Sequence, residues 1–144
     1  MRFLKPHRSC FTTIGGADSL LFLEKQKTVR TVERLGFGKC RLSIAMPKSI
    51  PYNGIQSLEN RRIATSYVRI LAGFLEQHHI RADIHEISGA VEIAPSLGLA
   101  DAIFDIVSTG STLLANGMRE VETVLTSEAL LIGQPNLSSD KQEI

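Results

Sequence analysis

The chain has 144 residues, room for one domain, and its 43% apolar and 22% charged residues exclude a wholly disordered, collagen-like or coiled-coil protein. It has neither a run apolar enough to span a membrane nor the apolar stretch of a secretory signal, so we expect a cytoplasmic protein with no membrane partner. The net charge of +1 is unevenly distributed, since residues 1–41 contain nine Lys and Arg but three Asp and Glu. These basic residues are scattered and have no aromatic residues interleaved among them, which argues against a nucleic-acid partner.

The first thirty residues carry the weakest structural pattern. Residues 11–19, FTTIGGADS, read as a loop because a glycine pair stands among small polar residues. Residues 20–29, LLFLEKQKTV, are compatible with a short helix, although their apolar residues are bunched. The pattern sharpens at residues 40–47, CRLSIAMP, where alternating apolar residues predict a strand that Pro47 ends.

A strand, a helix and a second strand are predicted over the middle of the chain. Residues 61–66, RRIATS, predict a short strand that delivers Thr65 or Ser66 as the N-cap of a helix. Apolar residues from position 67 onward recur on one helical face, and the helix is expected to end near His79. Alternation over residues 80–87 predicts the next strand.

The last third continues the alternation of helices and strands. Residues 88–98 predict a short helical stretch, and residues 99–107, LADAIFDIV, form the nearly continuous apolar run of a buried strand. A short helix ending at Asn116-Gly117 and two further strand candidates within residues 119–133 follow. The predicted class is α/β, with a mainly parallel sheet and helices on both faces. In such sheets ligands bind at the carboxyl ends of the strands.

The sharpest feature is the segment after the buried strand. Asp105 interrupts the apolar run near its end, where a carboxylate is costly to bury without a partner. A hydroxyl-rich loop around one glycine then opens a helix, and it consists of Ser108, Thr109, Gly110, Ser111 and Thr112. Backbone N–H groups and hydroxyls in such a loop can hold a phosphate. A Ser/Thr-rich turn in which Ser108 or Thr109 merely caps the helix remains an equal alternative.

Glu92 is the second candidate, in the otherwise apolar segment GAVEIAP. Its loop should face the same sheet edge as Asp105, where two carboxylates can hold sugar hydroxyls or a Mg²⁺ ion that carries a diphosphate. The commoner role of such a residue is that of a solvated helix position. No protein-bound metal site is predicted, since Cys10 and Cys40 are too few and too far apart for a zinc site.

Four segments together resemble the catalytic region of the ATP phosphoribosyltransferase family, which performs the first step of histidine biosynthesis. They run in the family's order from about Glu33 to Ile132, and they read LGFGKCRLSIAMP, RRIATSY, ISGAVEIAPSLGLADAIFDIVSTGSTLLANGMREVE and TSEALLI. The third is specific, because GxVExAP and GLADAIxDxVxTGxTLxxNG stand at a fixed spacing.

The resemblance implies a fold like a two-lobed periplasmic binding protein, with residues 33–132 as the second lobe. It implies that Ser108–Thr112 grip the 5′-phosphate of phosphoribosyl pyrophosphate, while Glu92 and Asp105 lie by the ribose and stabilise its developing charge. ATP is expected between the lobes, with Mg²⁺ on the diphosphate of the substrate. The implied reaction joins ribose C1 to N1 of the adenine and expels pyrophosphate, and the full-length family is expected to be homo-oligomeric.

The ends of the chain depart from the family pattern. Residues 1–32 contain no segment of the family's type IAxPKGRL and are expected to be a remnant of the first lobe, while 133–144 form a polar tail. The chain is therefore expected to be a fragment that binds phosphoribosyl pyrophosphate weakly and catalyses poorly on its own. The alternative is a non-catalytic phosphate-sugar-binding remnant or a regulatory partner of a complete enzyme.

Overall fold

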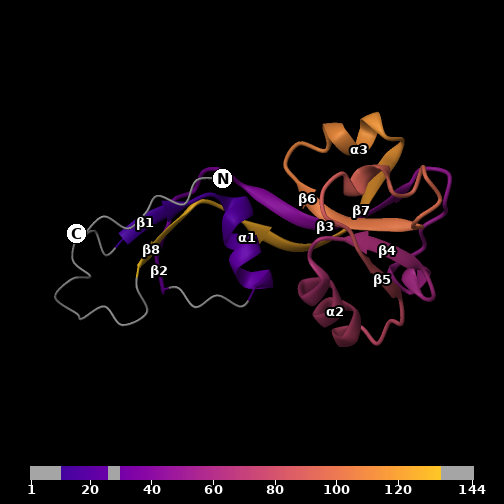
Figure 1. The fold of residues 1–144 in the computed structure, drawn as a ribbon, viewed down its shortest axis with the longest axis horizontal. Helices are drawn as coiled ribbons and strands as arrows, with labels where there is room; N and C mark the ends of the chain where they lie inside the picture. Colours follow the sequence, from indigo (N-terminus) through magenta and orange to yellow (C-terminus); the bar gives the residue numbers. More distant parts are fainter. Residues whose placement is uncertain (1–10, 26–29, 134–144) are drawn as a thin grey trace. The chain divides into compact units, whose positions relative to one another are not determined.

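The computed structural model describes residues 11–25 and 30–133, and its backbone divides into two compact units (Figure 1). One unit comprises residues up to Cys40 together with those from Ser127 onward, and the other comprises Arg41–Thr126. The expectations for residues 1–10 and for the polar tail after Gly133 lie outside the described residues. No described helix is long and apolar enough to cross a membrane.

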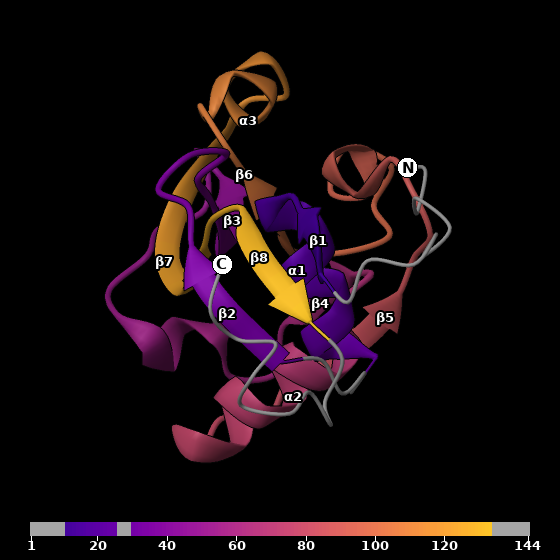
Figure 2. The ribbon, with the colours of Figure 1, turned by 90° about the vertical axis from the view of Figure 1, so that its left-hand side faces the viewer.

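The described residues of the first unit form a three-stranded antiparallel sheet and one helix. The strands β1 (Phe11–Ile14) and β2 (Arg30–Arg34) flank β8 (Leu130–Gly133), as Figure 2 shows, and α1 spans Gly16–Glu24. The expectation of a loop over residues 11–19 is therefore wrong. β1 forms because Phe11 pairs with Gly133, a partner that no local pattern of small polar residues reveals.

The second unit is built on a five-stranded sheet in the order β5-β4-β6-β3-β7. The strands are β3 (Cys40–Pro47), β4 (Arg62–Thr65), β5 (Asp83–Glu86), β6 (Ala102–Val107) and β7 (Met118–Ser127). β4 pairs in parallel with β5 and with β6, as the alternation predicts, whereas β3 runs antiparallel to β6. The N-terminal end of β3 consequently lies at the carboxyl end of β6.

Short helices connect these strands. The helix α2 spans Val68–Gln77 and α3 spans Ser111–Ala115, with 3₁₀ turns η1 at Ile55–Leu58 and η2 at Val91–Ile93. Figure 1 shows α2 below the strands of this unit and α3 above them. The α/β class predicted from the sequence is confirmed, and the helical stretch expected at 88–98 is reduced to η2 and turns.

The predicted N-cap of α2 is wrong. Tyr67 occupies the cap position and makes no side-chain cap hydrogen bond. The Thr65 hydroxyl instead accepts the Tyr67 N–H, and the Ser66 hydroxyl donates to the carbonyl of Ile87. The Ser66 hydroxyl thus links the end of β4 to the residue after β5, whereas the Thr65 hydroxyl closes a local turn before α2.

Apolar side chains on β3, β4, β6 and β7 pack with η2 and α3 into a core that borders the predicted site. Its buried members are Ala45, Ala64, Val91, Ala94, Ala100, Ile103, Val107, Leu113 and Met118. Val91 and Leu113 belong to the two segments that carry the candidate residues, so burial of these neighbours holds both segments against the end of β6.

Phe104→Ala is expected to lower the free energy of unfolding by about 3–5 kcal/mol, because its fully buried ring leaves a cavity in a core that relaxes only partly. Urea unfolding followed by circular dichroism measures the change. Phe37→Ala is the matched control, since Phe37 is 59% exposed and its loss should cost less than about 0.5 kcal/mol. Equal effects of the two substitutions would contradict the burial assigned to Phe104.

Candidate functional site

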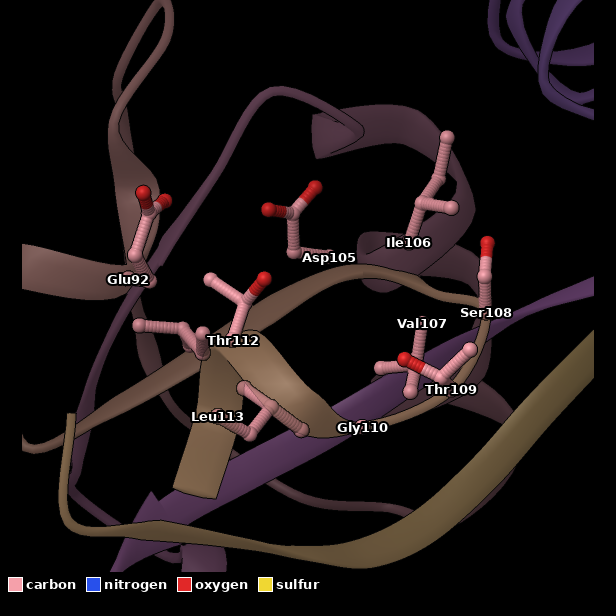
Figure 3. A pocket seen from close by; sticks show the side chains of 10 residues that line it. Glu92, Asp105, Ile106, Val107, Ser108, Thr109, Gly110, Thr112 and Leu113 are labelled. Atoms are coloured by element: carbon pink, nitrogen blue, oxygen red, sulfur yellow. The ribbon is translucent and has the colours of Figure 1, made fainter. Parts of the chain in front are cut away.

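A cavity of about 240 Å³ opens at the carboxyl end of β6 (Figure 3). It lies within the second unit and joins the end of this strand to the start of α3 and to η2. The lining residues are Glu92, Ile103, Asp105, Ile106, Val107, Ser108, Thr109, Gly110, Thr112 and Leu113. The structure therefore brings together six of the seven residues singled out in the sequence. The seventh, Ser111, does not line the cavity, but its hydroxyl shares a hydrogen bond of 2.9 Å with the Thr109 hydroxyl.

The hydroxyl-rich loop turns through a glycine in the left-handed region. Gly110 has φ 82° and ψ 0° and is the N-cap of α3, where no side chain supplies a cap hydrogen bond. The Thr109 hydroxyl accepts the Ser111 N–H at 3.3 Å and thereby closes a small turn before the helix. The loop consequently has a folded shape of its own: Gly110, not Ser108 or Thr109, occupies the N-cap position, while the Thr109 hydroxyl still accepts the first N–H of the helix.

Gly110→Ala is expected to reduce stability by about 1–2 kcal/mol, because an L side chain is strained at this positive φ even though nothing lies within 4 Å of the added Cβ. Gly73→Ala is the control. Gly73 is exposed on α2, and alanine there should stabilise the chain by about 0.4–1 kcal/mol. Thermal unfolding of the two variants compares the effects, and opposite signs are expected.

The two acids approach the cavity from different segments. Asp105 extends from β6 and Glu92 from η2, so that both carboxylates line one space (Figure 3). Burial raises the pKa of the Asp105 carboxyl, the Ile106 N–H opposes this rise, and the charge of Glu92 adds to it. A half-buried carboxylate beside a second one favours ligands that bring hydrogen-bond donors or positive charge. Hydroxyl groups and electron-poor centres are such groups.

Among the described residues, no group of three His, Cys, Asp or Glu side chains gathers as metal ligands require. Glu92 and Asp105 nevertheless supply hard oxygen donors of the type that Mg²⁺ takes. The donor set therefore fits an ion that arrives with oxygen ligands of its own.

Sequence reasoning missed Arg41, which follows Cys40 at the start of β3. Its Nη1 donates to the carbonyl oxygen of Ser108 at 3.3 Å, and its other nitrogens pair with Glu120 on β7. The only signal was a lone arginine in an apolar strand, and the partners lie 67 and 79 residues away.

Arg62 lies away from the candidate loop. At the N-terminal ends of β4 and β6 it pairs with Asp101 and donates from Nη1 to the carbonyl of Gly98. Because β4 and β6 are parallel, this pair lies at the opposite end of the strands from the loop at Ser108. Arg62 therefore organises the turn before β6.

Comparison with known proteins identifies a family. The model of the ATP phosphoribosyltransferase family matches residues 7–144 of this chain. The chain is 58% identical over 131 residues to the ATP phosphoribosyltransferase of Parabacteroides distasonis, covering 91% of this chain and 46% of the relative. It is 55% identical over 123 residues to the ATP phosphoribosyltransferase of Phocaeicola vulgatus, and the match covers 85% of this chain and 44% of that relative. The chain thus spans less than half the length of these curated relatives.

Solved structures show the same fold. The ATP phosphoribosyl transferase (HisG:HisZ) complex from Thermotoga maritima superposes with a TM-score of 0.74 at 25% identity, over 87% of this chain and 59% of that chain. A putative L-cystine ABC transporter from Listeria monocytogenes gives a TM-score of 0.60 at 15% identity, over 83% and 55%. The second likeness concerns the fold alone and confirms the periplasmic-binding-protein-like architecture. On the family match and the identity to its curated members, this chain belongs to the ATP phosphoribosyltransferase family.

Proposed function

We propose that this chain carries the phosphoribosyl-pyrophosphate-binding lobe of an ATP phosphoribosyltransferase. The reaction transfers the phosphoribosyl group to N1 of ATP and releases pyrophosphate, as the first step of histidine biosynthesis. The observation that carries the proposal is the cavity in which Glu92, Asp105 and the loop from Ser108 meet, in a chain that belongs to this family. ATP and phosphoribosyl pyrophosphate are cytoplasmic metabolites, so the proposal includes a cytoplasmic location.

The loop residues Ser108–Thr112 are proposed to hold the 5′-phosphate. Hydroxyls at positions 109 and 112 line the cavity, and Gly110 presents bare backbone where a phosphate oxygen can approach closely. No lysine or arginine is among the lining residues, so neutral donors supply the hydrogen bonds. Such donors bind a phosphate well when the fold fixes them beforehand, because they need little reorganisation on binding.

The acids are proposed to act on the ribose. In the reaction the bond between C1 and the diphosphate oxygen breaks while N1 of the adenine bonds to C1, and the ring gains oxocarbenium character. A carboxylate in a partly buried site stabilises such charge more than it would in water. Asp105 fits this role, and Glu92 fits the binding of ribose hydroxyls. Mg²⁺ bound to the substrate diphosphate would neutralise the leaving group, and no general base is assigned.

Calorimetric titration with phosphoribosyl pyrophosphate and Mg²⁺ tests the proposal. Binding should be competed by ribose 5-phosphate, which carries the 5′-phosphate, and much less by pyrophosphate. Absence of binding, or competition by pyrophosphate alone, would contradict the assigned loop. Association of several copies, which the family resemblance implies, also stays a prediction that sedimentation velocity tests.

A further inference from the structure

We propose that Arg41, held by Glu120, is a positioning residue that fixes the orientation of the candidate phosphate loop. The inference rests on the proposed function for its consequence in binding, but its structural part stands on the contacts of one guanidinium group. Arg41 Nε lies 2.6 Å from Glu120 Oε2, Nη2 lies 3.0 Å from Oε1, and Nη1 lies 3.3 Å from the Ser108 carbonyl oxygen.

The topology explains how one side chain reaches all three strands. β3 lies between β6 and β7 in the sheet, and its antiparallel pairing with β6 sets Arg41 opposite Val107. Arg41 therefore stands beside the last residue of β6, directly before the loop. Glu120 reaches it from β7, on the other side of β3.

The two bonds to Glu120 fix the plane of the guanidinium, because a carboxylate accepts both N–H groups of the fork in one geometry. With Nε and Nη2 held by Glu120, Nη1 is directed toward the carbonyl oxygen of Ser108. The Ser108 carbonyl and the Thr109 N–H belong to the same planar trans peptide, so they point in opposite directions. Holding the carbonyl toward Arg41 consequently turns the Thr109 N–H away from Arg41, at the first turn of the loop that lines the cavity.

Arg41 acts through the loop and does not contact the ligand in this proposal. It is not among the residues that line the cavity, and its charge is matched by Glu120. The hydrogen bonds from Arg41 lower the pKa of the Glu120 carboxyl, so the pair stays charged at neutral pH. The candidate phosphate donors are therefore oriented by an ion pair that contributes no net charge of its own.

The decisive variant is the charge swap Arg41→Glu with Glu120→Arg. It keeps opposite charges on β3 and β7, but the carboxylate introduced on β3 has no N–H for the Ser108 carbonyl, and the guanidinium introduced on β7 starts one strand farther from β6. Affinity for phosphoribosyl pyrophosphate should fall about tenfold, the effect of losing one charge-assisted hydrogen bond that orders the site. Hydrogen exchange at the Ser111 amide, which donates to the Thr109 hydroxyl within the loop, should accelerate in the unliganded chain.

The matched control is the swap Arg62→Glu with Asp101→Arg, because Arg62 also pairs with a carboxylate and donates its Nη1 to a carbonyl. This control should leave affinity and loop exchange at wild-type values. If the double swap does not fold, Arg41→Lys is tested in its place. It keeps the charge but lacks the forked donor, so it should show the same loss of affinity and the same faster exchange. Loop exchange and affinity unchanged in the Arg41 variants would overturn the inference. A wild-type chain that does not bind phosphoribosyl pyrophosphate would refute the proposed function, and the exchange measurement would still decide the role of Arg41.

Discussion

Replacing Thr109 and Thr112 together by alanine is expected to abolish measurable binding of phosphoribosyl pyrophosphate. Both side chains line the cavity, from either side of the glycine turn (Figure 3). Hydrogen bonds to a charged group contribute about 1.5–3 kcal/mol each, so losing two predicts an affinity about a hundredfold to ten-thousandfold weaker. The Thr109 substitution also removes the acceptor of the Ser111 N–H, which loosens the turn.

Thr126→Ala is the control for this double substitution, because Thr126 is an exposed threonine on β7 that does not line the cavity. Calorimetry measures binding, and circular dichroism verifies that each variant is folded. Binding that survives in the folded double variant would show that the phosphate is held elsewhere and that the loop is misassigned.

The strands with strong local patterns could be predicted from the sequence. The alternating residues of Cys40–Pro47 form β3 with the predicted bounds, and the apolar run ending at Val107 forms β6. Their side chains reach 0% exposure at positions such as Leu42 and Phe104, and this burial is what the pattern of apolar residues encodes.

The elements that depend on distant partners could not be predicted. β1 owes its formation to pairing with β8 near the other end of the described chain, and α1 begins at Gly16 within the segment expected to be a loop. The antiparallel direction of β3 was hidden for the same reason, since the alternation of strands and helices describes only the consecutive parallel pairs.

The contacts of the candidate site likewise include some that the sequence predicts and some that depend on distant partners. The approach of Glu92 to Asp105 follows from the rule that residues after parallel strands meet at one edge, and the structure brings both to one cavity. The contact of Arg41 with Ser108 follows only from the direction of β3. The roles assigned to the acids and to the loop stay predictions that ligand binding must test.

Asp105→Asn is expected to stabilise the folded chain at neutral pH while it weakens binding of phosphoribosyl pyrophosphate about ten- to hundredfold. Burial, with the nearby charge of Glu92, raises the pKa of Asp105 in the folded state. Between its ordinary pKa and the raised value, the folded chain holds more protons than the unfolded chain, so wild-type stability falls as pH rises through that window. Asparagine mimics the neutral carboxyl and removes this loss.

The advantage of the variant should be largest above the raised pKa and should vanish as pH falls below the ordinary value for Asp, about 3.9. Urea unfolding across this range measures it. Asp101→Asn is a control of opposite sign, because hydrogen bonds from Arg62 lower the pKa of Asp101. Its carboxylate contributes stability above the ordinary pKa that is lost as pH falls, so that variant should be less stable at neutral pH.

An Asp105→Asn variant less stable than the wild type at neutral pH would show that the carboxylate is satisfied within the fold, and a structural role would then suffice. A variant that is more stable than the wild type but binds the ligand more weakly would show that the carboxylate serves binding and not folding. The carboxylate would then be kept at a cost to folding, and the only compensation is what it does for a ligand in the cavity. The two measurements together therefore separate a residue that holds the lobe together from one that serves the ribose.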